Sequence, residues 1–440
     1  MSKRTKFLLG IGVIAALVIG WQIAAFAGPV GTAQGFEDDD GNLAPNGGTP
    51  NFDWNSFAPV TWSPHPATTP TRQTDAKTVS GFQFKGIEDW GDNCSDTSFA
   101  GGTKQDTNCP SVGTGKPPNK DDLKRIYLSS KTLPSNGHTF LDLAWVRIPQ
   151  NTTSSSAHVG FEFNQGSTAC PAGSDGLVQR TAGDILIVYD FEGGSSPVVL
   201  TLRKWVTAAN ATCEVGSSKP PCWGVAQNLT TGGFAEGAVN AGTPVQDALT
   251  PPALSSTTGT SITEGLGDTE FGEAGIDLTA AGVIPANSCA SFGKAYAVSR
   301  SSGNSGQAQM KDLVGPANFS ITNCASVIIR KQTSPDEDPN TTNFGYTTNV
   351  TTNPATTTSP FTLQDDGVKT IQNVVQGSGK TVTEDDPSPG YALTSIDCNA
   401  STVPAANRST NTTTRAVTFS IAGGETLDCT FPTRSRQVRS

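Results

Sequence analysis

Apolar and polar residues alternate in short runs along most of the chain after residue 80, as they do in β-strands. In residues 159–164, Val, Phe and Phe alternate with Gly, Glu and Asn, which is typical of a strand with one buried face. The apolar residues 185–191 are followed by a Gly- and Ser-rich turn and a second apolar run at 198–206, which predicts a hairpin. No long stretch has the 3.6-residue apolar spacing of an amphipathic helix. The pattern therefore predicts an all-β protein.

The spacing of these runs divides the chain into two sandwiches. Residues 28–80 are rich in Asp, Asn, Gly, Pro and Thr and are expected to be loop-rich. Residues 81–325 are expected to form one large antiparallel β-sandwich, in which residues 230–265 are a surface loop. Six or seven short strands in residues 326–433 predict a small Greek-key β-sandwich, followed by a basic tail at residues 434–440.

The first 27 residues have the features of an export signal. Lys3, Arg4 and Lys6 precede an apolar run at residues 7–26, and the run ends in the small-residue site Ala25-Phe-Ala27. This order predicts a signal peptide at residues 1–27. The run is also long enough for an uncleaved membrane anchor, which would then be the protein's only attachment to a membrane. Either alternative predicts a secreted or cell-surface protein.

The charge balance excludes one class of partner. Without residues 1–27 the chain has 26 basic and 39 acidic residues, a net charge of −13. A basic patch that could neutralise phosphates is missing, so nucleic acid is not an expected partner. We expect a cell-wall, matrix or protein partner instead.

Nine cysteines in an exported chain predict disulfides rather than metal ligands, and no CxxC motif is present. The sequence does not fix their connectivity. Proximity along the chain favours the pairs Cys94–Cys109, Cys213–Cys222, Cys289–Cys324 and Cys398–Cys429, and it leaves Cys170 unpaired.

The smaller predicted unit resembles the prealbumin-like, pilin-type (CnaB-like) domain of bacterial surface proteins. The resemblance is carried by Ile328-Ile-Arg-Lys331, by Phe361-Thr-Leu-Gln-Asp-Asp-Gly367, by Pro389-Gly-Tyr391 and by Leu427-Asp-Cys-Thr-Phe431, and it covers about a quarter of the chain. Segments such as Phe161-Glu-Phe-Asn-Gln165 and Phe271-Gly-Glu-Ala-Gly-Ile-Asp-Leu278 make the preceding unit similar to the large β domain that stands ahead of such modules in secreted actinobacterial proteins. The resemblance implies a structural or adhesive surface protein, without a catalytic activity.

Many such domains contain a Lys–Asn isopeptide bond that a buried carboxylic acid promotes. The resemblance implies Lys331 as the amine and Glu384 as the acid. The Asn should stand near the end of the last strand, but that stretch reads Cys429-Thr-Phe-Pro-Thr433. We therefore expect no isopeptide bond, and Lys331 and Glu384 should be an ion pair or surface charges. A Cys398–Cys429 disulfide would link the same sandwich covalently.

Catalytic motifs are missing from the sequence. The three histidines, His65, His138 and His158, form no H-E-x-x-H motif, and no G-x-S-x-G motif occurs. Carboxylates that could be paired for glycoside hydrolysis are Glu162, Asp184, Asp190, Glu270 and Glu273, although exposed carboxylates at strand edges are the ordinary interpretation. We therefore predict no catalytic residues and no enzyme.

Two groups of residues could bind a ligand. Asp38 and Asp40 are calcium candidates, but the EF-hand spacing fails because its first position would be Phe36, and a solvated acidic turn is the alternative. No other cofactor is expected. Trp90 and Trp223 are candidates for stacking on sugars, whereas Trp145 and Trp205 lie in apolar runs and should be core residues. The hypotheses are a non-enzymatic structural or adhesion protein, a carbohydrate-binding module or lectin, and a secreted hydrolase.

Overall fold

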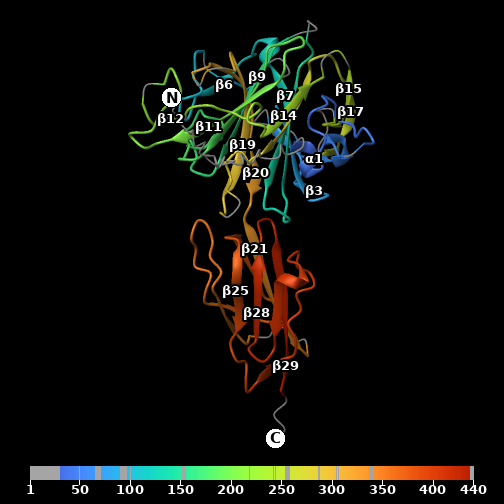
Figure 1. The fold of residues 1–440 in the computed structure, drawn as a ribbon, viewed down its shortest axis with the longest axis vertical. Coiled ribbons are helices and arrows are strands. Elements are labelled where there is room, and N and C mark those ends of the chain that lie inside the picture. The colour runs from blue at the N-terminus through green and yellow to red at the C-terminus, as the bar shows by residue number, and fades with distance from the viewer. Residues whose placement is uncertain are drawn as a thin grey trace, which may run out of the picture.

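The computed structural model describes residues 30–436, apart from residues 49, 65–70, 90–96, 100, 151–154, 218, 241, 243, 253–257, 286–287, 304, 306 and 336–340. The expected signal peptide lies outside the described residues, as do His65, Trp90, Cys94 and the last four residues of the basic tail. Figure 1 shows a large unit (residues 30–324) at one end and a small unit (residues 325–436) at the other, with the C-terminus at the far tip of the small unit.

The large unit is built on two sheets whose described strand pairs are all antiparallel. One sheet runs in the order β12-β11-β10-β9-β19-β20-β5-β6, with β13 on β11. Its strands are β5 (Thr97–Phe99), β6 (Val112–Thr114), β9 (Ala157–Asn164), β10 (Ile185–Phe191), β11 (Val199–Val206), β12 (Cys222–Trp223), β13 (Gln227–Asn228), β19 (Ser291–Arg300) and β20 (Met310–Thr322). The expected hairpin at 185–206 is β10 paired with β11.

The second sheet runs in the order β14-β18-β8-β7-β4-β2, with β3 on β4. Its strands are β2 (Thr71–Gln73), β3 (Lys77–Val79), β4 (Phe82–Asp89), β7 (Leu123–Thr132), β8 (Thr139–Arg147), β14 (Ala235–Val239) and β18 (Phe271–Asp277). Apolar side chains from both sheets share one core, in which the Trp145 ring packs edge-on against Tyr189 with centroids 5.6 Å apart. The all-β class and the antiparallel sandwich are confirmed.

The N-terminal segment forms a third layer on this second sheet. It contains helix α1 (Val30–Gln34), the 3-10 helix η1 (Trp54–Phe57) and strand β1 (Thr61–Trp62), which pairs with β16 (Gly259–Thr260). Its fully buried side chains Phe36, Trp54, Phe57 and Trp62 pack into one cluster with Tyr127 of β7. Strand β8 is consequently buried at every residue, polar ones included, because both faces of its sheet are covered.

Residues 230–265 are not the surface loop that their small side chains predict. They contain β14, β15 (Val245–Thr250) and β17 (Ile262–Leu266), and the last two pair with each other. Leu249 and Leu266 are buried in the aromatic cluster of the N-terminal segment. The prediction was wrong because a few apolar residues are enough for a strand that packs on an existing layer. A further 3-10 helix of the large unit is η2 (Asn119–Asp121).

The small unit is a sandwich of two sheets in the orders β24-β21-β29-β26 and β23-β22-β25-β28-β27. Its elements are β21 (Ala325–Ser334), β22 (Phe344–Thr348), β23 (Phe361–Leu363), β24 (Val368–Val374), β25 (Gly377–Glu384), β26 (Tyr391–Leu393), the 3-10 helix η3 (Ala405–Asn407), β27 (Arg408–Asn411), β28 (Ala416–Ile421) and β29 (Thr426–Ser435). Strands β21 and β29 run parallel, and alternate residues of both face the core. Nine described strands replace the six or seven expected.

Candidate functional site

The junction between the two units is two residues long. Strand β20 ends at Thr322 and β21 begins at Ala325, so only Asn323 and Cys324 lie between them. The fully buried Asn323 side chain accepts a hydrogen bond from the Ala290 amide at 2.8 Å and donates one to the Pro285 carbonyl at 2.9 Å. Cys324 forms a disulfide with Cys289. Both junction residues are therefore fixed to the large unit.

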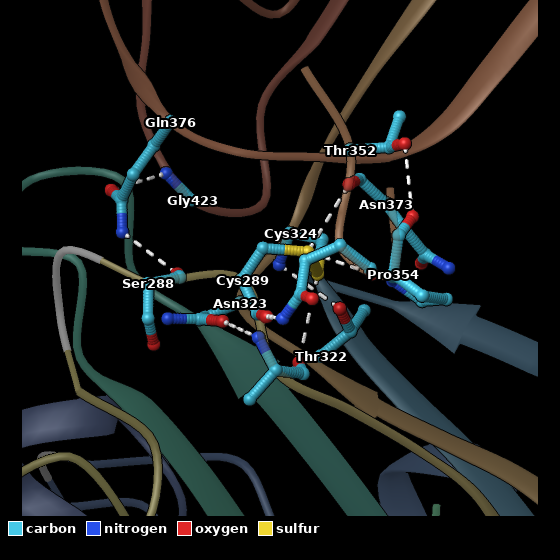
Figure 2. Close-up of a disulfide and its surroundings, with 12 residues drawn as sticks. Ser288, Cys289, Thr322, Asn323, Cys324, Thr352, Pro354, Asn373, Gln376 and Gly423 are labelled. Carbon is cyan, nitrogen blue, oxygen red and sulfur yellow. Dashed lines mark hydrogen bonds between the residues drawn. A yellow bond between two sulfur atoms is a disulfide. The ribbon is translucent and has the colours of Figure 1, made fainter. Parts of the chain in front are cut away.

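Side chains of the small unit complete the junction, as Figure 2 shows. The Asn353 amide donates to the Cys289 carbonyl at 2.5 Å. The Gln376 side chain donates from Nε2 to the Ser288 carbonyl at 3.2 Å, and its Oε1 accepts from the Gly423 backbone amide at 3.1 Å. These contacts reach the neighbouring residues Ser288 and Cys289 beside the disulfide, so the connection is a stiff joint and not a flexible linker.

Gly424 makes the close approach at this joint possible. It has φ = +76°, a conformation that favours glycine, and its amide donates to the Cys324 carbonyl at 3.2 Å. A Cβ atom at this position would lie 3.2 Å from the Cβ of Thr132 in β7. The loop between β28 and β29 can therefore lie directly against the large unit.

Eight of the described cysteines form four disulfides. Cys213–Cys222, Cys289–Cys324 and Cys398–Cys429 are the pairs that proximity along the chain favours. The fourth is Cys109–Cys170, so the expected Cys94–Cys109 pair and the unpaired Cys170 are wrong. The two cysteines are 61 residues apart in sequence, but the Val112 amide bonds the Gly173 carbonyl and draws their loops together. Chain distance could not show this contact.

Removing the Cys398–Cys429 disulfide is expected to lower the free energy of unfolding of the small unit by about 2–4 kcal/mol, because the bond closes a loop of 31 residues. The double variant Cys398→Ala/Cys429→Ala should lower the unfolding temperature of the small unit in differential scanning calorimetry. The matched control Cys213→Ala/Cys222→Ala lies in the large unit and should leave that temperature unchanged. Equal shifts in the two variants would contradict the prediction.

Lys331 and Glu384 form an ion pair in the core of the small unit. Both side chains are fully buried, and Lys331 Nζ lies 2.5 Å from Glu384 Oε1. The ammonium also donates to the Phe431 carbonyl at 3.1 Å, and the Tyr346 hydroxyl donates to Glu384 Oε1 at 3.3 Å. Burial lowers the pKa of Lys331 and raises the pKa of Glu384, while the attraction between the two groups opposes both shifts. Of the two alternatives, the ion pair is confirmed and surface charges are wrong.

The strand register explains what replaces an isopeptide acceptor. Lys331 of β21 stands opposite Phe431 of β29, and residues 429–433 supply Cys, Thr, Phe, Pro and Thr. The Lys331 ammonium therefore faces a main-chain carbonyl where the resemblance implies an Asn side chain. The Cys398–Cys429 disulfide lies in the same core as this pair.

Trp223 is not a surface residue. It is fully buried, packs edge-on against Trp205 with centroids 5.2 Å apart, and donates from Nε1 to the Gln105 carbonyl at 3.1 Å. The Arg180 guanidinium lies 4.9 Å from both rings. Pairing of β12 with β11 sets Trp223 opposite Trp205, which flanking Gly and Cys residues could not reveal. Trp145 and Trp205 are core residues, as expected.

The carboxylates considered for glycoside hydrolysis are buried and bonded within the fold, not exposed at strand edges. Glu162 forms a bidentate ion pair with Arg180 at 2.7 and 2.8 Å. The others are hydrogen-bonded to neighbouring groups. Asp184 accepts from the Thr181 amide and Asp190 is paired with the His158 ring. Glu270 accepts from the Gly267 amide and Glu273 from the Gly41 amide. His138 is paired in the same way with Asp277 at 2.6 Å. These groups hold loops and strands together.

Asp38 lies in a buried acidic cluster under the N-terminal segment. The Gln34 side-chain amide donates to Asp38 Oδ2 at 2.9 Å and to Asp142 Oδ1 at 2.5 Å. Burial raises the pKa of Asp142 to about 7, and it raises the pKa of Asp38 together with repulsion from Asp142 and Glu236. A Cβ at position 275 would collide with Asp38, so Gly275 of β18 makes room for this carboxyl group. Asp40 lies outside this cluster and is exposed.

One comparison with known proteins identifies the fold family of the small unit. Residues 327–435 match the family described as the prealbumin-like fold domain, so the small unit is a prealbumin-like domain. No curated protein matches the chain. No helix in the part of the chain that the structure describes is both long and apolar enough to cross a membrane.

Solved structures similar to the chain come from bacterial surface proteins. One is a bacterial adhesin from Mobiluncus mulieris that contains intramolecular disulfide, isopeptide and ester bond cross-links, with 11% identity, a TM-score of 0.21, and coverage of 70% of this chain and 90% of that chain. Another is the major pilin from Streptococcus pyogenes, with 13% identity, a TM-score of 0.19, and coverage of 46% and 89%. A third is the T-13 major pilin of that species, with 10% identity, a TM-score of 0.18, and coverage of 64% and 88%.

Proposed function

We propose that the protein is a non-enzymatic structural or adhesion protein, secreted or held at the cell surface, in which the small unit is a stalk that presents the large unit to a partner. The observation that supports this proposal most directly is the stiff joint. The Cys289–Cys324 disulfide holds the two-residue connection to the large unit, and hydrogen bonds from Asn353 and Gln376 hold the end of the elongated small unit against it. A fixed joint transmits force from a partner to the stalk without bending.

The covalent links fit the same proposal. Four disulfides are typical of an oxidising compartment outside the cytoplasm. One is in the small unit, one is at the joint, and two are in the large unit. They connect segments 9 to 61 residues apart, so pulling on the chain cannot extend those segments fully. We infer a cell-wall, matrix or protein partner that binds the large unit.

The two alternatives have less support among the described residues. A lectin would need an accessible aromatic ring, but Trp223 is buried under Arg180 and Trp205. A glycoside hydrolase would need free carboxylates in a cleft, but Glu162, Asp184 and Glu273 are buried and bonded. The binding and turnover measurements below distinguish both alternatives from a structural or adhesion protein.

The proposal is tested by locating the protein and measuring its binding. Antibodies against the full chain should label intact, unpermeabilised cells or detect the protein in the medium. Protein immobilised through its C-terminus, which leaves the large unit free, should retain a cell-wall or matrix protein fraction, and protein immobilised through random lysines should retain less. Detection only in the cytoplasm, or turnover of ester, peptide or glycoside substrates, would refute the proposal.

A further inference from the structure

Three carboxylates of the N-terminal segment converge at the surface of the large unit. Glu37, Asp40 and Asp53 each offer one oxygen, and the three oxygens lie within 4.8 Å of one another. Glu37 and Asp53 are buried, whereas Asp40 is exposed, so the group opens to solvent on one side. Only Asp40 is among the residues that the sequence suggests for calcium, because Asp38 lies in the neighbouring buried cluster. An acidic cluster alone does not indicate a ligand, because exposed acidic groups are common without one.

The carboxylate of Asp53 is only partly satisfied within the fold. Its side chain is fully buried, and Oδ1 accepts a hydrogen bond from the Trp54 amide at 2.5 Å as the cap of η1. Its second oxygen, Oδ2, is buried and has no hydrogen-bond partner among the described residues. Burying an unpartnered carboxylate oxygen is costly, because the oxygen loses its hydration and gains nothing in return. An ion bound by this group would supply the missing interaction.

The other carboxylates are held in place by the same loop. Glu37 Oε2 accepts from the Asn46 amide at 2.9 Å, and Asp40 Oδ1 accepts from the Asn42 amide at 2.9 Å. The Asn46 side-chain amide donates to Asp40 Oδ2, which links the two ends of the loop. These bonds leave further lone pairs free on each carboxylate. The oxygens are therefore positioned before any ligand arrives.

The local charge favours a cation. Burial and repulsion from Asp40 and Glu37 raise the pKa of Asp53. Glu273, whose Oε1 accepts from the Gly41 amide at 2.7 Å, has its pKa raised by burial and by repulsion from Asp53 and Asp40. For both acids the neighbouring charges that act most strongly are other carboxylates. A divalent cation would relieve this repulsion.

We propose that Glu37, Asp40 and Asp53 bind a Ca²⁺ ion, with water completing the coordination on the exposed side. Calcium binds oxygens at 2.3–2.6 Å, so two oxygens on one ion lie at most about 5 Å apart, and the observed group meets this limit. Mg²⁺ is the competing ion, and it demands a near-ideal octahedral geometry with shorter bonds of about 2.0–2.1 Å. The ion would hold the two ends of the 37–53 segment together, directly before η1, which contributes Trp54 and Phe57 to the third layer.

The test is a titration of the metal-stripped full chain with CaCl₂ by isothermal calorimetry. Saturable one-site binding is expected with a dissociation constant of about 0.1–1 mM, the range of extracellular calcium modules. Asp53→Asn keeps the capping oxygen of η1 and removes one charge, and it should weaken binding by roughly tenfold or more, as should Glu37→Gln. Asp75→Asn, a control at an exposed position of the same unit, should bind as the parent protein does.

Two results would overturn the site. The first is a parent protein without saturable Ca²⁺ binding up to roughly 10 mM, ten times the weak end of the expected range. The second is binding by Asp53→Asn or Glu37→Gln that is as tight as in the parent. If either buried variant fails to fold by circular dichroism, the exposed Asp40→Asn replaces it and must also weaken binding. Equal affinity for MgCl₂ would overturn the assignment to calcium.

Discussion

Replacing Lys331 with Met is expected to destabilise the small unit by about 3–5 kcal/mol, because the change leaves Glu384 as an uncompensated charge in the core. Both side chains are fully buried, and Lys331 Nζ contacts Glu384 Oε1 at 2.5 Å. The other partner of Glu384 Oε1 is the uncharged Tyr346 hydroxyl, and Oε2 has no hydrogen-bond partner among the described residues, so the more distant Arg415 is the cation that remains. The loss should appear as a lower midpoint in urea denaturation followed by circular dichroism.

The double variant Lys331→Met/Glu384→Gln separates a charge effect from a packing effect. It removes both charges, retains similar volumes and leaves Tyr346 an acceptor. Replacing a buried pair by neutral groups is often close to neutral, so most of the lost stability should return. A double variant no more stable than Lys331→Met would show that packing, and not the unpaired charge, causes the loss.

The neighbouring residue offers a matched control. Arg330 pairs with Asp428 at 2.9 Å on the outer side of the same strands, and its side chain is 43% exposed. An exposed pair contributes little because water screens it, so Arg330→Met should change the midpoint only slightly. Equal losses in Arg330→Met and Lys331→Met would contradict the prediction. Intact mass spectrometry adds an independent check, because an isopeptide bond at Lys331 would remove ammonia from the chain.

Local patterns in the sequence predicted what depends on neighbouring residues. The hairpin of β10 and β11 and the disulfide Cys213–Cys222 join segments close in the chain, where alternation and proximity are informative. Alternation also indicated β21 and β29, whose inner residues form the core of a two-layer sandwich. In each case one strand with one buried face, or one short loop, determines the contact.

Such local patterns could not predict features that depend on the third layer, which the N-terminal segment forms on the second sheet. The second sheet is covered on both faces, so a polar residue of β8 is buried whichever way it points. Asp142 of β8 and Glu273 of β18 therefore lie in the interior, although the sequence predicts an exposed strand edge for Glu273. The Cys109–Cys170 bond and the burial of Trp223 likewise follow from contacts between distant loops. The sequence did not indicate Asp53 as a calcium candidate, because its place beside Glu37 and Asp40 depends on the fold of the 37–46 loop.

The acidic cluster beneath this layer should make the stability of the large unit depend on pH. Asp142 has a pKa of about 7 in the fold, against an ordinary value of 3.8. Between these values the folded chain holds a proton that the unfolded chain releases, so stability is highest at acidic pH, falls as the pH rises toward 7, and stays low above it. The whole shift corresponds to a free energy on the order of 4 kcal/mol. Raised pKa values of Asp38 and Glu236 act in the same direction.

Asp142→Asn isolates this contribution. The Asn side chain keeps an oxygen for the Gln34 amide, which lies 2.5 Å from Asp142 Oδ1, but it cannot ionise. In urea denaturation with a chelator present, the variant should already be somewhat more stable than the parent at pH 5, which lies above the unfolded pKa of 3.8. From pH 5 to pH 8 its advantage should grow by about 2–3 kcal/mol, because over the two units below pH 7 the parent loses about 1.4 kcal/mol per unit. The exposed control Asp75→Asn should follow the parent. Parallel profiles of Asp142→Asn and the parent would show that Asp142 is ionised in the fold, with Lys131, which lowers its pKa, as the stabilising charge.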